Sequence, residues 1–304
     1  MKRVLAAAVL LGSLCFAQQP TAPAPTGSTG PSVGATADVT EQLVPVSMSD
    51  IYCSGVMTDK PVSRANFVVG GLGTPDQVRF GERDLIYIKG TYQPGTLVSV
   101  LREWRTEDTT EFYQGVRKMQ KEAGQPYLDE GYAKVIEQRG EFAVARVQFS
   151  CDPIVNGDLV VPFQERPLVK VRQRTTANRF PVASGGLNGK IVMVREGDHF
   201  AAVGRKVFLN LGSEKGVKPG DYFQVVRGYT ADVYDAADKA TLSSTITDDT
   251  QKNPPKIADR SELPQRLVGE LVVLNVQDKT ATAMVTFMLE EIHAGDAIQM
   301  EQAQ

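Results

Sequence analysis

The chain has 304 residues, with 33 basic and 36 acidic side chains, a formal net charge of −3 and 42% hydrophobic residues. This balance is mildly acidic, and no large basic domain stands out. Because neutralisation of phosphate charge supplies most of the affinity of nucleic-acid-binding proteins, the composition argues against a nucleic-acid partner.

Residues 1–17, MKRVLAAAVLLGSLCFA, have the pattern of a secretory signal peptide. Lys2 and Arg3 precede a short apolar run, and small residues predict cleavage after Ala17. The run is shorter than the roughly 20 residues needed to span a bilayer. We therefore expect no transmembrane segment after cleavage, and a location in the periplasm or on the outer envelope surface. Lipidation of Cys15 is the alternative that this segment leaves open.

Residues 18–48 are expected to form a disordered tether. Their first part, 18–37, consists mainly of Pro, Gly, Thr, Ser and Ala and has no aromatic residue. Such a composition cannot bury enough apolar surface to offset the entropy of ordering the chain.

Two cysteines, Cys53 and Cys151, remain after the predicted cleavage. An even number of cysteines in an exported protein indicates a disulfide. The bond would close a loop of 98 residues (151 − 53), which the chain-entropy model values at roughly 4–5 kcal/mol. Two buried free thiols are the alternative.

The rest of the chain contains an internal duplication. Residues 131–161 align with 269–299 at a constant offset of 138 without a gap, and nine of the 31 positions are identical. Chance agreement at average residue usage would give about two.

A second pair of segments, 83–102 and 205–227, extends the duplication, with the second copy three residues longer. The matched residues are Gly90 with Gly212, Pro94-Gly95 with Pro219-Gly220, and Arg102 with Arg227. The chain is therefore predicted to contain module 1 (49–165), a cationic linker (166–185), module 2 (186–301) and a tail (302–304).

Both modules are predicted to be small β-barrels or sandwiches, so the fold class is all-β. Short runs alternate apolar and polar residues with period two, and Gly, Pro and Asn signals separate them. Pro219-Gly220 fits a type II turn, and Asn156-Gly157 is typical of a hairpin turn. The residues predicted to form structural turns are Pro94, Gly95, Gly157, Asp158, Pro219, Gly220, Asp221, Gly295 and Asp296.

Two insertions, 103–130 and 228–266, interrupt the modules at equivalent points. The first is predicted to contain one short helix within 108–124, with a capping pair Asp108 and Glu111 and an end at Gly124. The second is long and mostly polar. Because loops on a rigid sheet commonly carry recognition, we predict that the insertions determine what the protein binds.

No motif for catalysis, cofactor binding or metal binding is recognised. The glycine-rich segment 212–218 has the wrong spacing for a phosphate loop, and a strand is expected after it. His199 and His293 have no spaced partners and are interpreted as surface or loop residues. We therefore predict no cofactor and no enzymatic activity.

Lys170, Arg172 and Arg174 alternate in the linker, so an extended chain would place them on one side. One hypothesis is that they bind an anionic envelope polymer. The alternative is that they pair with the acidic residues of the second insertion.

The pattern KVFLNLGSEKGVKPGDYFQVVR, an insertion, and then LVGELVVLNVQDKTATAMV and IHAGDAIQM, resembles the C-terminal domain of the flagellar assembly protein T family. It is also similar to domains that accompany LysM modules in exported bacterial proteins. The resemblance covers 205–300 and, through the duplicate, 83–161 more weakly. It implies a β-barrel-like module that acts in envelope assembly or adhesion, and it brings no catalytic residue.

The predicted function is accordingly that of a non-enzymatic envelope protein with a protein or peptidoglycan partner. The alternative is a periplasmic enzyme that acts on envelope polysaccharide or peptide. The sequence does not indicate an oligomeric state.

Overall fold

The computed structural model describes residues 43–105, 113–174, 176–181, 185–229 and 263–301. These residues form mainly antiparallel β-structure with two short α-helices, so the predicted all-β class is confirmed. The predicted signal peptide, most of the tether, most of the second insertion and the tail lie outside the described residues.

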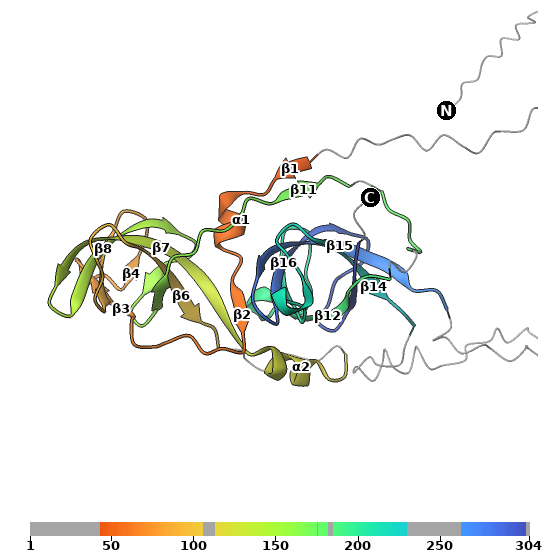
Figure 1. Cartoon of the computed structure of the whole chain (residues 1–304), viewed down its shortest axis with the longest axis horizontal. Coiled ribbons are helices and arrows are strands. Elements are labelled where there is room, and N and C mark those ends of the chain that lie inside the picture. Colours follow the sequence, from red (N-terminus) through yellow and green to blue (C-terminus); the bar gives the residue numbers. More distant parts are fainter. Residues whose placement is uncertain (1–42, 106–112, 175, 182–184, 230–262, 302–304) are drawn as a thin grey trace, which may run out of the picture. The chain divides into compact units, whose positions relative to one another are not determined.

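Module 2 is a closed barrel of six antiparallel strands (Figure 1). Around the barrel the order is β12-β13-β16-β15-β14-β17. The strands are β12 (Asn188–Val194), β13 (Lys206–Leu209), β14 (Tyr222–Arg227), β15 (Arg266–Val276), β16 (Ala281–Met288) and β17 (Ala297–Met300). Alternate side chains from each strand fill the interior, and Phe223, Val273 and Val285 there are fully buried.

Module 1 repeats the same strand order as β3-β5-β8-β7-β6-β10. Its strands are β3 (Val68–Gly71), β5 (Leu85–Lys89), β6 (Leu97–Glu103), β7 (Gln125–Arg139), β8 (Phe142–Ser150) and β10 (Leu159–Pro162). The first and last strands meet only at an isolated bridge between Phe67 and Leu159, where module 2 has a continuous ladder. A small ribbon of β4 (Arg79–Phe80) and β9 (Ile154–Val155) lies beside them.

The register confirms the duplication at offset 138. In β7 and β8, Val135 pairs with Ala145, and in β15 and β16 the equivalent Val273 pairs with Ala283. The two bulges in each of these ladders also fall at equivalent positions. A slip of one residue would turn the buried side chains outward, so the gapless alignment preserved the register.

The alignment of the opening strands was wrong by one residue. Leu85 pairs with Arg146, whereas Lys206 pairs with Met284, so Leu85 corresponds to Lys206 at an offset of 121. Arg102 corresponds to Arg227 at an offset of 125. The segment between the two matched positions is therefore four residues longer in the second copy (125 − 121), and not three. Matching the glycines Gly90 and Gly212 misplaced this strand, because strand register follows the buried alternate side chains and not the loop glycine.

Both Pro-Gly turns have the predicted geometry. Gly95 and Gly220 each have φ of 92°, as the third position of a type II turn requires. Asn156-Gly157 is also a turn, with Gly157 at φ 93°, but it does not join a hairpin. The strands on its two sides, β9 and β10, pair with β4 and β6 and not with each other.

Helix α2 (Val116–Ala123) is the helix predicted in the first insertion, and it ends at Gly124 as expected. The proposed capping pair, Asp108 and Glu111, lies outside the described residues. A second helix, α1 (Met48–Tyr52), was not predicted. It begins at Ser47, whose hydroxyl accepts a hydrogen bond of 3.0 Å from the backbone N–H of Asp50.

The segments on either side of module 1 pack against module 2, which corrects the predicted boundaries. Strand β1 (Leu43–Pro45), placed in the tether by the sequence, pairs with β11 (Lys170–Arg172) of the linker. Behind them Val46, Ile51 and Val169 are buried against Val272 of module 2. The described residues of both modules consequently belong to one compact unit.

Strand β2 (Val56–Thr58) also joins the modules. It pairs with the start of β7, while the Thr282 hydroxyl of module 2 donates a hydrogen bond of 2.9 Å to the Gly55 carbonyl. Thr280 makes the equivalent bond to the Met57 carbonyl.

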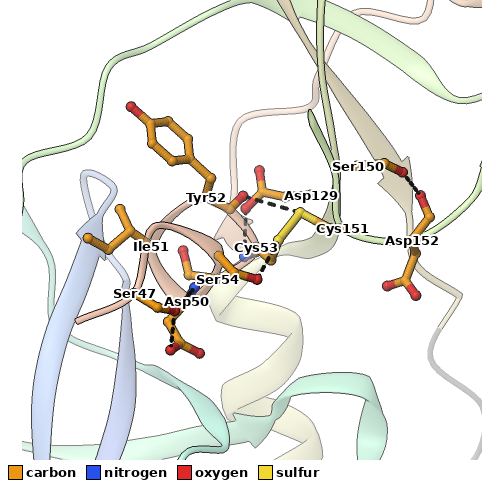
Figure 2. The surroundings of a disulfide bond; sticks show 12 residues. Ser47, Asp50, Ile51, Tyr52, Cys53, Ser54, Asp129, Ser150, Cys151 and Asp152 are labelled. Carbon is orange, nitrogen blue, oxygen red and sulfur yellow. Dashed lines mark hydrogen bonds between the residues drawn. A yellow bond between two sulfur atoms is a disulfide. The ribbon is translucent and has the colours of Figure 1, made fainter. Parts of the chain in front are cut away.

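The predicted disulfide is present between Cys53 and Cys151, whose Cα atoms lie 5.6 Å apart (Figure 2). It ties the end of α1 to the end of β8.

Beside the disulfide, Asp129 accepts hydrogen bonds of 2.8 Å from two nitrogens of Arg166 and one of 2.7 Å from the Gly55 backbone N–H. This buried ion pair fastens the linker to β7.

Candidate functional site

Each module contains an arginine–aspartate clamp, built from residues at equivalent positions. The arginine lies in the last two residues of β6 or β14, and the aspartate follows the glycine of the last turn. Clamp 1 consists of Arg102 and Asp158, and clamp 2 consists of Arg227 and Asp296. All four residues were predicted only as features of turns or of the alignment, and their pairing was not foreseen.

The two clamps have nearly the same geometry. In clamp 1, Arg102 donates bonds of 2.9 and 2.8 Å to the two carboxylate oxygens of Asp158. In clamp 2, Arg227 donates bonds of 2.8 and 2.7 Å to those of Asp296. Both aspartates are almost fully buried. Each clamp is therefore a charge-assisted, bidentate pair that holds the final turn against the barrel.

Backbone groups complete each clamp. Asp158 also accepts a 2.7 Å bond from the N–H of Val155, and Asp296 accepts the same bond from His293. This local side-chain bond is the reason for an aspartate directly after the turn glycine. The Gly-Asp pattern in the sequence was thus a signal of the clamp.

Clamp 2 is covered by Tyr113 from the first insertion. The Tyr113 hydroxyl donates a hydrogen bond of 2.9 Å to Oδ1 of Asp296, and the residue is only 8% exposed. Its ring lies on Gly295, where an added Cβ would come within 2.6 Å of a ring carbon. Burial, and then the charge of Asp296, raise the pKa of the Tyr113 phenol, so the hydroxyl keeps its proton and remains a donor.

The described part of the first insertion therefore joins the modules. Val116 and Met119 of α2 pack with Tyr113 and Ala294, and Ala123 packs on Val192 of β12 (Figure 1). Residues 113–123 of this insertion are thus packed against module 2, and the prediction that the insertions determine what the protein binds stays a prediction. The second insertion between residues 230 and 262 lies outside the described residues.

Clamp 1 opens onto a cavity of about 510 Å³. Its walls include Arg102, Asp158, Asn156, Gly157 and Leu159, with Arg64 and Phe67 opposite. Among the described residues, no atom lies within 4 Å of the position that a Cβ at Gly157 would take. The Arg102 side chain is 33% exposed, whereas that of Arg227 is 15% exposed. The surface that Tyr113 covers in module 2 is thus accessible in module 1.

A buried carboxylate, Glu130, lies behind clamp 1. Glu130 is fully buried, 3.2 Å from a guanidinium nitrogen of Arg102, and among the described residues neither of its carboxylate oxygens accepts a hydrogen bond. Burial raises the pKa of Glu130 to about 8, although the positive charge of Arg102 acts in the opposite direction. Sequence reasoning missed this residue, because nothing in its neighbours marks a buried acid.

His293 is a loop residue, as interpreted, but it lies beside clamp 2 with a mostly buried side chain. Its Nδ1 atom is 3.1 Å from a guanidinium nitrogen of Arg227, and burial lowers the pKa of the imidazole. His199 is exposed. The two histidines are not brought together.

Two arginines of the cationic linker contact acidic residues of module 2. The acidic residues of the second insertion lie outside the described residues, so the two hypotheses for the linker stay predictions. Arg172 and Arg174 lie 3.0 and 3.1 Å from Glu270, and both also pair with Glu301. Burial raises the pKa of Glu270, and the two arginines oppose this shift. Only Lys170 of the predicted trio is exposed. The two arginines thus compensate the charge of Glu270, a buried acid of module 2.

Among the described residues, no three His, Cys, Asp or Glu side chains gather as a metal ion would require. No helix in this part of the chain is long and apolar enough to cross a membrane. No family model matches the chain, and a search of curated proteins found no match.

Proposed function

We propose that the protein is an exported, non-enzymatic protein of the cell envelope that binds a protein or cell-wall partner through module 1. The observation that carries the proposal is the difference between the two clamps. Clamp 2 is covered by the chain itself, whereas clamp 1 opens onto a cavity. A concave site with an apolar wall and a few fixed polar groups is the usual form of a binding site.

Two observations support export. The first 17 residues have the pattern of a signal peptide, and Cys53 and Cys151 form a disulfide, a bond that persists mainly in oxidising compartments. N-terminal sequencing of the mature protein is expected to begin at Gln18. A chain that starts with acylated Cys15 would replace this cleavage with lipid attachment, and a chain that retains Met1 would contradict export.

The assembly role is proposed from the resemblance to the flagellar assembly protein T C-terminal domain. The closed six-stranded barrel of module 2 supports a small β-barrel-like module of the kind that the resemblance implies. An enzymatic role gains no support from Glu130, because that carboxylate is fully buried and does not line the cavity.

The test compares two variants for retention on isolated envelope material. Asn156 is exposed at the mouth of the cavity, so Asn156→Trp is expected to fill the cavity without disturbing the core. Gln93→Trp is the matched control, because Gln93 is also an exposed turn residue but lies away from the cavity. Loss of retention in Asn156→Trp alone supports the proposal. Equal retention of both variants and the wild type would refute it.

A further inference from the structure

We propose that clamp 1 binds a tyrosine side chain presented by another polypeptide, with the phenol hydroxyl donating a hydrogen bond to Asp158. This inference rests on the proposed function and specifies the chemistry of the partner. It starts from the way the molecule itself covers the equivalent clamp 2.

The floor of the cavity matches the surface on which Tyr113 lies. Asn156, Gly157 and Asp158 of module 1 correspond to Ala294, Gly295 and Asp296 of module 2 at the offset of 138. In both modules the glycine has a positive φ and no side chain, which leaves a flat surface beside the carboxylate. Tyr113 contacts this surface in module 2, whereas in module 1 no described atom lies within 4 Å of the equivalent Cβ position.

The polar end of the cavity has room for one more donor. Oδ1 of Asp296 accepts two bonds, one from Arg227 and one from the Tyr113 hydroxyl. Oδ1 of Asp158 accepts a bond from Arg102, and a carboxylate oxygen has capacity for a second. An O–H donor placed as in module 2 would fill that position.

The charges favour a neutral donor over an anion. The Arg102 guanidinium already lies between the carboxyl groups of Asp158 and Glu130. A phosphate or a carboxylate in the cavity would approach Asp158 at hydrogen-bond distance and be repelled. Phenylalanine would keep the ring contact and lose the hydrogen bond. The site therefore selects tyrosine over both phenylalanine and phosphotyrosine.

The tyrosine is assigned to another polypeptide because of where the chain's own tyrosines lie. The sequence has nine, and Tyr234 alone lies outside the described residues. None of the other eight lies over Gly157, since no described atom comes within 4 Å of its Cβ position. Occupation of clamp 1 by Tyr234 is therefore the competing outcome, and the test includes it.

The probe is a synthetic peptide with the sequence of residues 108–120, DTTEFYQGVRKMQ, which contains Tyr113. It is titrated into the ¹⁵N-labelled mature protein and followed by NMR. Clamp 2 is already covered within the molecule, where the effective concentration of Tyr113 is high. Saturable shifts are therefore expected at the Gly157 amide and not at Gly295. A peptide with Phe in place of Tyr is expected to bind about tenfold more weakly, because a hydrogen bond to a charged acceptor is lost.

Matched variants localise the binding. Asn156→Trp is expected to abolish the shifts at Gly157, whereas Gln93→Trp leaves them unchanged. Equal binding of the Tyr, Phe and phosphotyrosine peptides would overturn the proposal, as would the absence of saturable binding up to millimolar peptide. If the peptide binds only after Tyr234→Phe, clamp 1 is occupied by the chain's own tyrosine and the proposal is also wrong.

The peptide titration tests the ligand, and the envelope retention assay tests the proposed function, so a negative result in one does not imply a negative result in the other. Retention that depends on the cavity, together with no preference for tyrosine, would leave the proposed function standing and refute only the ligand. Tyrosine-selective binding without any envelope retention would retain the ligand and refute the envelope partner.

Discussion

Replacing Glu130 with glutamine is expected to protect the protein from unfolding at alkaline pH and to change its stability little near pH 4. Glu130 is fully buried, and its pKa is raised from 4.5 to about 8, chiefly by burial. Between these two values the folded protein holds a proton that the unfolded chain releases. This proton contributes stability that is fully present below pH 4.5 and is lost as the pH rises through about 8.

The size of the effect follows from the two pKa values. They differ by about 3.5 units (8 − 4.5), and each unit corresponds to about 1.4 kcal/mol, so the full linkage is about 5 kcal/mol. Local opening that admits water to the carboxylate would reduce the measured value. Even half of it is large against the total stability of about 5–15 kcal/mol that is typical of folded proteins.

The assay is urea unfolding of the wild type and of Glu130→Gln at pH 5, 7 and 9. Glutamine keeps the shape of the side chain and cannot ionise, so the difference in unfolding free energy between variant and wild type is expected to grow by about 1.5–5 kcal/mol from pH 5 to 9. Glu165→Gln, at an exposed site at the end of module 1, is the control for the general effect of removing an acid. A difference that stays constant with pH would refute the reasoning about Glu130.

Three further predictions concern the bonds that hold the two modules together. Cys53→Ser with Cys151→Ser should lower the unfolding free energy by about 4–5 kcal/mol, and added reductant should then have no further effect on the urea midpoint. Tyr113→Phe removes a buried hydrogen bond to a carboxylate and should cost about 1.5–3 kcal/mol by the same measurement; a cost near zero would mean that the bond does not form in solution. Arg166→Ala leaves a buried carboxylate unpaired and should cost about 3–5 kcal/mol, whereas Lys60→Ala, in an exposed pair, should leave the unfolding free energy almost unchanged.

The sequence predicted correctly those parts of the fold in which the turn residues and the alternation of buried side chains indicate the same structure. The segment 131–161 matched its duplicate in register because both copies have to bury the same alternate side chains. The turns at Gly95 and Gly220 were predictable because only glycine takes the positive φ at low cost. The end of α2 at Gly124 has the same cause.

The errors arose where tertiary partners decide the structure. Asn156-Gly157 is a hairpin signal only when the strands on its two sides pair with each other, and here they pair with other strands. The contacts of Arg172 and Arg174 with Glu270 were not predicted, because a sequence pattern shows on which side charges lie but not that Glu270 is buried beneath them. Tyr113 was missed as the cover of clamp 2, since the contact joins residues 183 positions apart.

The duplication itself explains why one clamp is covered and the other is open. Two copies of a module necessarily present two equivalent clamps. The insertion that leaves module 1 after Arg102 runs to module 2 and uses Tyr113 to fasten the modules together. Clamp 2 is thereby part of the junction, and the buried contacts of α2 make its opening costly. Clamp 1 keeps the same charges and the same flat glycine surface without having to join the modules. A surface that module 2 uses for packing is thus left uncovered by the described residues in module 1, where we propose that it binds a partner.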